Sequence, residues 1–364
     1  MKILALIIAL ALATGALAEE RPIDIVICLD TSGSMSGLIE AAKQKLWDIV
    51  NELGRAKPKP HLRVGLYVYG TPGYGADTGY VKKLINLTDD LDSVYAQLTP
   101  LRTNGGDEYV ARVVRASLLE QPWSKEKDAL KIIVVAGNEP ATQDPKFKSL
   151  DIAKETITAG IIVNTIYCGS PGSSEADGWR AVAQAADGQF ASIDHNNGTV
   201  VVSTPFDTKL AELSGSINKT YVGYGDGGGE GYARQAAADA SSFASSPAVA
   251  ASRAVAKAGG QYRNTAWDLV DAREQKDFDL AKVKEEALPA EMQKMTMDER
   301  KAYLDKKATE RVELQKQINE LNVKRQQFIT DEMKKSGKST DKAFDAAMLK
   351  SIREQATRKG LQFE

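Results

Sequence analysis

Short apolar runs alternate with helix-like segments along the first part of the chain. Residues 23–29, 62–69, 130–135 and 161–168 are almost continuously apolar, which predicts strands buried on both faces. Residues 81–87 and 189–193 predict two further strands, the first of them at the edge of the sheet. A helical spacing of three or four is clearest between positions 38 and 53, at Leu38, Ala42, Leu46, Ile49 and Leu53. Gly54 then ends this predicted helix.

Further helices are predicted at 110–119, 150–159 and 179–186, between the strands. Strands that alternate with helices in this way form an α/β fold with a mostly parallel, doubly wound sheet. We therefore predict one such domain over residues 21–221. In sheets of this kind ligands bind at the carboxyl ends of the strands, where the strand order reverses.

The composition changes after this predicted domain. Residues 222–261 are rich in Gly, Ala and Ser and predict a flexible linker, with a short helical piece near 234–238. This stretch lacks the Gly-Lys-Ser/Thr ending of a phosphate-binding loop, which argues against a nucleotide site.

Residues 262–364 predict a separate helical region. Its anchor would be a small set of apolar residues: Tyr262, Trp267, Leu269, Val270 and Phe278. Thr296 and Glu299 have the spacing of a capping box and predict a helix start. The positions that follow step by three and four, as in a coiled-coil seam: Leu314, Ile318, Leu321, Arg325 and Phe328. A second helix at 341–358 would fold back on the first as a hairpin, and homodimerisation through the tail is the alternative.

Polar side chains follow the first predicted strand directly. Asp30, Ser32 and Ser34 place one carboxylate and two hydroxyls in a single turn before a helix. Hard oxygen ligands of this kind suit Mg²⁺, which prefers octahedral oxygen coordination and keeps some waters. The alternative is that these residues only cap the next helix.

The pattern Asp30-x-Ser32-x-Ser34 resembles the metal-ion-dependent adhesion site of the von Willebrand factor type A domain. The resemblance implies that Ser32 and Ser34 bind the metal directly, while Asp30 binds it through water or holds the loop. It also implies two further loops. In the loop at 103–108 either Thr103 or Asp107 would stand in the place of the family's Thr. In the loop after 130–135, Asn138 takes the place of the usual Asp, which predicts weaker metal affinity unless Asp107 or Glu139 compensates.

The segment that begins at Leu288-Pro289 and continues through Glu291 and Met292 looks like the helical tail of exported bacterial proteins of this family. That part of the resemblance supplies no activity.

The first residues predict export. A short basic start, an apolar core and the Ala-x-Ala pattern at 16–18 are typical of a secretory signal peptide cut after Ala18, so we expect a periplasmic or secreted protein with no membrane span after cleavage. Cys28 and Cys168 would then meet an oxidising compartment. In the usual strand order another strand separates them by about 9–10 Å, whereas a disulfide needs Cα atoms within about 7 Å. Two buried thiols are therefore expected.

An enzymatic function finds little support in this sequence. Its two histidines, His61 and His195, lie in turns, and Gly33–Gly37 places Met at the centre of what would be a nucleophile elbow. A net charge of −2 gives no general attraction to nucleic acid. We expect a non-catalytic module that binds a protein partner through Mg²⁺, Mn²⁺ or Ca²⁺, with the partner offering an acidic residue to the metal. The alternative is a structural scaffold with a degenerate metal site that acts through its helical tail.

Overall fold

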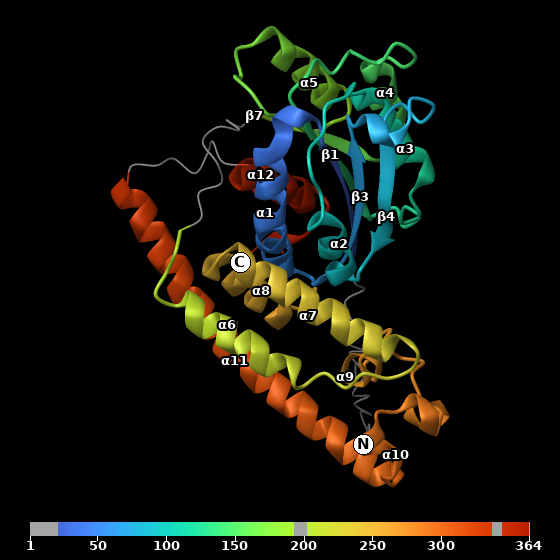
Figure 1. The fold of residues 1–364 in the computed structure, drawn as a ribbon, viewed down its shortest axis with the longest axis vertical. Helices are drawn as coiled ribbons and strands as arrows, with labels where there is room; N and C mark the ends of the chain where they lie inside the picture. Colours follow the sequence, from blue (N-terminus) through green and yellow to red (C-terminus); the bar gives the residue numbers. More distant parts are fainter. Residues whose placement is uncertain (1–20, 193–201, 337–343, 364) are drawn as a thin grey trace, which may run out of the picture.

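A computed structural model describes residues 21–192, 202–336 and 344–363. The predicted signal peptide and His195 lie outside these ranges. The chain forms a six-stranded sheet with helices on both faces, and further helices extend below it (Figure 1). None of the helices in the described ranges combines the length and apolar composition that crossing a bilayer requires.

The central sheet has the strand order β4-β3-β1-β5-β6-β7. All neighbouring strands are parallel except the edge pair β3 and β4, which is antiparallel. The strands are β1 (Arg21–Asp30), β3 (Pro60–Tyr69), β4 (Val81–Thr88), β5 (Leu130–Gly137), β6 (Ile162–Tyr167) and β7 (Phe190–Ser192). The predicted α/β fold and its mostly parallel sheet are thus confirmed.

Each face of the sheet carries its own hydrophobic core. Alternate residues of β1 point to opposite faces: Ile25 joins the core under α1 and α2, whereas Val26 joins the core under α3, α4 and α5. These helices are α1 (Ser36–Gly54), α2 (Leu91–Leu98), α3 (Val110–Glu120), α4 (Ser149–Thr158) and α5 (Ser174–Ala185). Cys28 and Cys168 are buried thiols, one in each core, as predicted.

The stretch predicted as a flexible linker is instead mostly helical, well beyond the short helical piece predicted near 234–238. After α6 (Asp207–Asn218), the helices α7 (Gly227–Ser245) and α8 (Pro247–Ala258) occupy most of residues 222–261. The prediction was wrong because small residues can serve close packing as well as mobility. In α7 they recur on the buried face, at Gly228, Gly231, Ala238 and Ser242, and Gln235 is the one longer side chain on that face. A Cβ at Gly231 would collide with the Trp267 ring, so the missing side chain is what lets this helix pack.

Helix α8 is the centre of the helical part and packs against α1, α6, α7 and the long helix α11 (Met297–Ser336). It carries a buried cation, Arg253, whose guanidinium pairs with Asp92 of α2 at 2.5 Å and with Asp239 of α7 at 2.9 Å. The same guanidinium lies 4.4 Å from the ring of Trp47 in α1. These contacts hold the helical part against the sheet domain.

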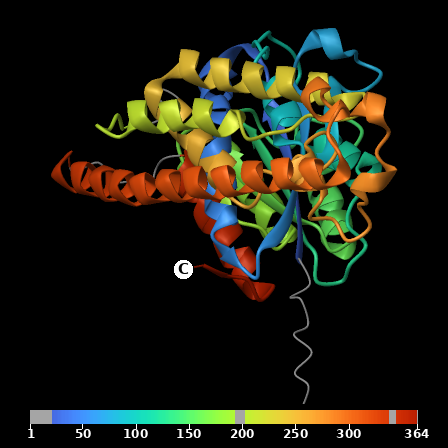
Figure 2. The ribbon, with the colours of Figure 1, turned by 90° about the horizontal axis from the view of Figure 1, so that it is seen from below.

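The long helix α11 (Met297–Ser336) runs along one side of the molecule (Figures 1 and 2). Its capping box forms as predicted: the Thr296 amide donates to Glu299 at 2.8 Å, and the Glu299 amide donates to Thr296 at 3.4 Å. The predicted seam is used within the chain, because Ile318 is buried in a core built with α6 and α8. The predicted apolar anchor is also present, with Trp267 in that core and Leu269, which begins α9 (Leu269–Ala272), in a neighbouring one.

Helix α12 (Phe344–Arg358) does not pair with α11 as a hairpin. It packs against α1, β7 and the terminal strand β8 (Gln362–Phe363), which pairs with β2 (Ala56–Lys57). Ile352 joins the core under α1. The helix returns to the sheet domain because its buried face completes that core. A short helix α10 (Ala290–Gln293) precedes α11.

Candidate metal site

The first predicted loop lies where β1 ends and α1 begins. Asp30 and Ser32 are buried, whereas Ser34 is exposed. The Ser32 amide donates to Asp30 Oδ1 at 2.7 Å, which fixes the turn. The residue that precedes α1 is Met35, and it forms no side-chain cap. Capping of α1 therefore does not account for the side chains of Asp30, Ser32 and Ser34.

The first and third loops converge through their hydroxyl and amide groups. The Oγ atoms of Ser32 and Ser34 are 3.3 Å apart, and Ser34 Oγ donates to Asn138 Oδ1 at 3.3 Å. Asn138 follows β5, the parallel neighbour of β1, so both loops leave the sheet at the same edge. Three of the predicted metal ligands are thus neighbours in space.

The second loop brings a residue that the sequence prediction missed. Asp107 is exposed and accepts a hydrogen bond from Tyr109 at 3.4 Å, while Thr103 is half-buried. Neither has a described hydrogen bond to Asp30, Ser32 or Ser34. Glu108 is instead the buried carboxyl group of this loop, with 6% of its surface exposed. The available signal was its place directly before the apolar face of α3, which begins at Val110.

Asp30 and Glu108 meet over Gly70, just after β3. A Cβ on Gly70 would lie 2.8 Å from Asp30 Oδ1 and 2.9 Å from Glu108 Cγ, and the φ angle of Gly70 is +84°. A glycine is therefore required here, both for the backbone conformation and for the space that the two carboxyl groups occupy.

The carboxyl pair is short of hydrogen-bond donors. Asp30 Oδ2 and Glu108 Oε2 are both buried, and neither atom has a partner among the described residues. Burial raises the pKa of Asp30 to about 6, against the lowering effect of the Ser32 hydrogen bonds. Burial and the neighbouring Asp30 charge raise the pKa of Glu108 to about 9. A bound cation would lower the pKa of both carboxyl groups, because it favours the ionised carboxylates.

The loops are held in place by contacts behind the site. Thr31 Oγ1 donates to the Tyr69 carbonyl at 2.9 Å, and the Thr31 carbonyl accepts from the Asn104 amide at 2.9 Å. Trp179 Nε1 donates to the Glu139 carbonyl at 2.7 Å and fixes the third loop. These contacts tie all three loops to the rigid sheet domain, as a preformed binding site requires.

The donor set fits a hard divalent ion. It offers serine hydroxyls, an amide oxygen and two carboxyl groups, all of them oxygen ligands. Within the described ranges, no three His, Cys, Asp or Glu side chains gather as a metal cluster. An ion at this site would therefore depend on Ser32, Ser34 and Asn138 as well as on the carboxyl groups.

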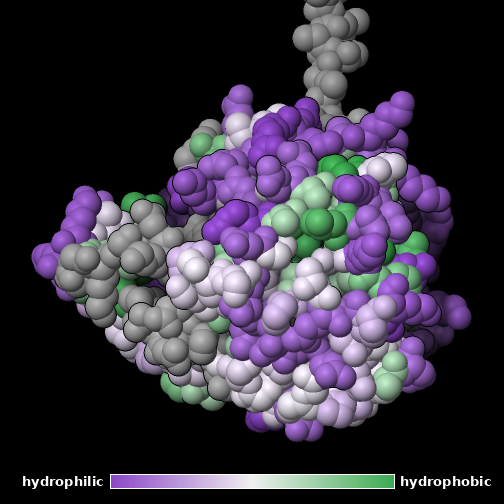
Figure 3. Space-filling view, turned by 90° about the horizontal axis from the view of Figure 1, so that it is seen from above, coloured by the Kyte–Doolittle hydropathy of each residue, from purple (hydrophilic) through white to green (hydrophobic). Residues whose placement is uncertain are grey.

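The edge of the sheet that carries these loops points upward in Figure 1. Seen from that side, the molecule is mostly hydrophilic, with a compact hydrophobic area near its centre and smaller ones toward its rim (Figure 3). His61, by contrast, lies near the start of β3, at the opposite edge, and contacts Asp89 at 3.4 Å.

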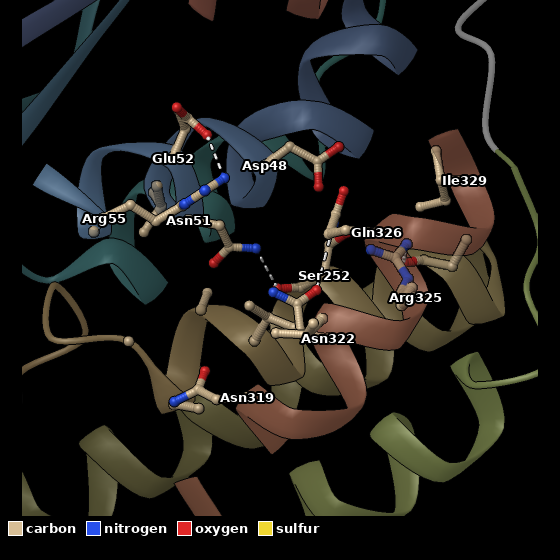
Figure 4. A pocket seen from close by; sticks show the side chains of 18 of the residues that line it. Asp48, Asn51, Glu52, Arg55, Ser252, Asn319, Asn322, Arg325, Gln326 and Ile329 are labelled. Atoms are coloured by element: carbon tan, nitrogen blue, oxygen red, sulfur yellow. Dashed lines mark hydrogen bonds and ion pairs between the residues drawn. The ribbon is translucent and has the colours of Figure 1, made fainter. Parts of the chain in front are cut away.

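A separate cavity of 730 Å³ lies between α1, α8 and α11 (Figure 4). Polar side chains dominate the labelled part of its wall, including Asp48, Asn51, Asn322 and Gln326. Asn51 Nδ2 of α1 donates a hydrogen bond to the Ser252 carbonyl of α8 at 3.0 Å. None of the predicted metal ligands lines this cavity, so it is distinct from the candidate metal site.

Residues 25–139 match the family model of the von Willebrand factor type A domain. No curated protein matches the chain. Among solved structures, the chain is similar to proximal thread matrix protein 1 from the mussel byssus, described with a zinc-occupied MIDAS motif, at 12% identity over 49% of this chain and 43% of that chain, with a TM-score of 0.38.

Two bacterial structures are similar at the same level. The first is the pilus adhesin SpaC from Lactobacillus rhamnosus GG, which is 17% identical over 49% of this chain and 30% of that chain, with a TM-score of 0.36. The second is an aerotolerance-related membrane protein from Bacteroides fragilis NCTC 9343, which is 17% identical over 48% of this chain and 93% of that chain, with a TM-score of 0.34. The matched residues 25–139 span β1 to the third loop and so include Asp30, Glu108 and Asn138. Residues 25–139 are therefore what the chain shares with the von Willebrand factor type A domain, and a helical C-terminal region follows the sheet.

Proposed function

We propose that this protein is a non-catalytic, exported binding module that holds a protein partner through a divalent metal ion. The observation that carries the proposal is the pair of buried, unpartnered carboxyl oxygens, Asp30 Oδ2 and Glu108 Oε2, beside two serine hydroxyls. Such a pair needs a proton or a cation to offset its charge, and the proposed ion would take the place of the proton. Ser34 is exposed, which supports the proposal because a partner would be able to reach an ion held there.

Each side chain has a distinct part in this proposal. Ser32, Ser34 and Asn138 would hold the ion with neutral oxygens, while Asp30 and Glu108 would balance its charge directly or through water. Asp107 and Thr103 remain predicted ligands of the second loop. The ion, Mg²⁺ or else Mn²⁺ or Ca²⁺, would supply a Lewis-acidic point at which a carboxylate of the partner completes the coordination shell.

The test is a calorimetric titration of Mg²⁺ or Mn²⁺ into the full chain, combined with thermal melting. We expect heat and a raised Tm in the parent, loss of both in Ser32→Ala, and tighter binding in Asn138→Asp because a carboxylate replaces an amide. Ser245→Ala, at an exposed serine of α7, is the matched control and should behave like the parent. A parent with no heat and no melting shift would refute metal-dependent binding.

That refutation would favour the second candidate, a scaffold that acts through its helices. The supporting observation is the exposure of apolar side chains on the helical part, with Phe243 65%, Val312 64% and Val323 71% exposed. Isolated exposed apolar residues are common on soluble proteins. The metal site is therefore the better supported proposal.

A further inference from the structure

Three cationic side chains surround one aromatic ring next to the second loop of the candidate metal site. The ring of Phe147, just before α4, lies 5.0 Å from the Arg112 guanidinium, 4.7 Å from the Arg115 guanidinium and 5.4 Å from Lys146 Nζ. Each contact lies within the range of a cation–π interaction. Three like charges on one ring repel each other, so the arrangement concentrates positive charge on this part of the surface.

The acidic side chains of the protein neutralise only part of that charge. Asp144 forms two hydrogen bonds with Arg112, at 2.9 and 2.8 Å, and its side chain is fully buried. Across the ranges that the structure describes, no carboxylate forms an ion pair with Arg115 or with Lys146. Two positive charges thus remain available to an external anion.

Aromatic rings connect this cluster to the candidate metal site. Arg112 lies 5.5 Å from the ring of Tyr109, which directly follows Glu108, and Tyr109 lies 5.7 Å from Tyr80. Tyr80 has a φ angle of +57°, a conformation that costs energy for an aromatic residue and that clusters at functional sites. We call the set Tyr80, Tyr109, Arg112, Arg115, Lys146 and Phe147 the basic aromatic surface.

We propose that the basic aromatic surface binds an acidic segment of the protein partner, next to the carboxylate that the metal would hold. This inference rests on the proposed function and adds the chemistry of the partner: at least one further Asp or Glu close to the metal-binding one. Arg115 offers the planar fork that pairs with a carboxylate, and Lys146 offers a point charge. Tyrosine, phenylalanine and arginine are enriched at protein interfaces, which favours a polypeptide as the ligand.

The probe is a fluorescein-labelled decapeptide of alternating Asp and Glu, and the readout is its fluorescence anisotropy with the full chain in Mg²⁺. We expect the double variant Arg115→Glu/Lys146→Glu to raise the Kd by about tenfold or more, because two attractive contacts become repulsive. The matched control is Lys125→Glu/Lys127→Glu. It makes the same change of charge in the exposed loop before β5, at the opposite edge of the sheet, and should leave the Kd within about twofold of the parent.

The outcomes separate this inference from the proposed function. If Ser32→Ala or removal of Mg²⁺ leaves peptide binding unchanged while the Arg115/Lys146 variant weakens it, the metal proposal fails and the basic aromatic surface stands. The inference is overturned if the parent does not bind the peptide, if both double variants weaken it equally, or if a peptide of Asn and Gln binds as well. Equally tight binding of a single-stranded oligonucleotide of the same charge would also overturn it.

Discussion

Asp30 and Glu108 are 78 positions apart in the sequence, yet their side chains lie next to the same glycine, Gly70. Burial raises the pKa of both groups, and the charge of Asp30 raises the pKa of Glu108 further. The pair links the stability of the metal-free domain to pH. This link can be measured without any partner.

The first prediction concerns the pH dependence of that stability. A carboxyl group whose pKa is raised by folding stabilises the folded state at low pH, and this contribution is lost as the pH rises through the folded-state pKa. For Glu108 the window runs from its ordinary 4.5 to about 9. We expect the free energy of unfolding of the metal-free protein to fall across this window by up to about 1.4 kcal/mol per pH unit. Urea denaturation in EDTA at pH 5, 7 and 9 measures it.

Glu108→Gln should flatten this slope, because the amide keeps the shape and does not titrate. Glu126→Gln, at an exposed glutamate in the loop before β5, is the control and should keep the parent's slope. Equal slopes in the parent and in Glu108→Gln would contradict the assignment of the pH dependence to this residue.

A second prediction concerns Gly70. Gly70→Ala should lower the free energy of unfolding by about 3 kcal/mol, since the new Cβ suffers both the positive φ and the crowding against the two carboxyl groups. Gly225→Ala isolates the first effect, because Gly225 has a φ of +64° and the Cβ that alanine adds there would meet no neighbouring atom within 4 Å. It should cost only about 1 kcal/mol. Equal losses in the two variants would show that crowding at the carboxyl pair is unimportant.

The strands and the first loop were predictable from local pattern. The run before Asp30 is apolar at every position but Asp24, and a strand buried on both faces needs that composition. Even the exception is explained in the structure: Asp24 accepts two hydrogen bonds from Arg63 at 2.9 and 2.8 Å. Parallel strands then bring Asp30 and Asn138 to one edge, which follows from the order of strands and helices alone.

The second loop and the helical part were less predictable, because their structure depends on contacts between distant segments. The place of Glu108 directly before the apolar face of α3 is the signal that the sequence offers, but whether Glu108 turns inward and Asp107 outward depends on the space over Gly70. The small residues of α7 suggest mobility when read locally, but Gly231 lets the helix approach the Trp267 ring and Ser242 accepts a hydrogen bond from Trp47 Nε1. Tertiary packing overrides local propensity in both cases.

A third prediction concerns Arg311, a charged residue that interrupts the apolar seam of α11. Its guanidinium is buried and pairs with Asp268 at 2.8 Å and with Asp271 at 2.7 Å. Removing one partner of a buried pair leaves the other charge uncompensated, so Arg311→Ala should cost about 3–5 kcal/mol. Arg273→Ala breaks the exposed pair with Asp305 and should cost less than about 1 kcal/mol. Urea denaturation compares them, and similar losses would contradict an anchoring role for Arg311.

The last prediction tests where the seam of α11 is used. Ile318 is fully buried against α6 and α8 within one chain, whereas Val323 on the same helix is 71% exposed. Ile318→Ala should therefore cost about 2–5 kcal/mol, and Val323→Ala should change stability by less than about 0.5 kcal/mol. Because the contact is intramolecular, the Tm of the parent and of Ile318→Ala should not depend on protein concentration. In a dimer held by this seam, the Tm would rise with protein concentration. A Tm that rises with concentration in the parent, but not in Ile318→Ala, would instead assign the seam to an interface between two chains.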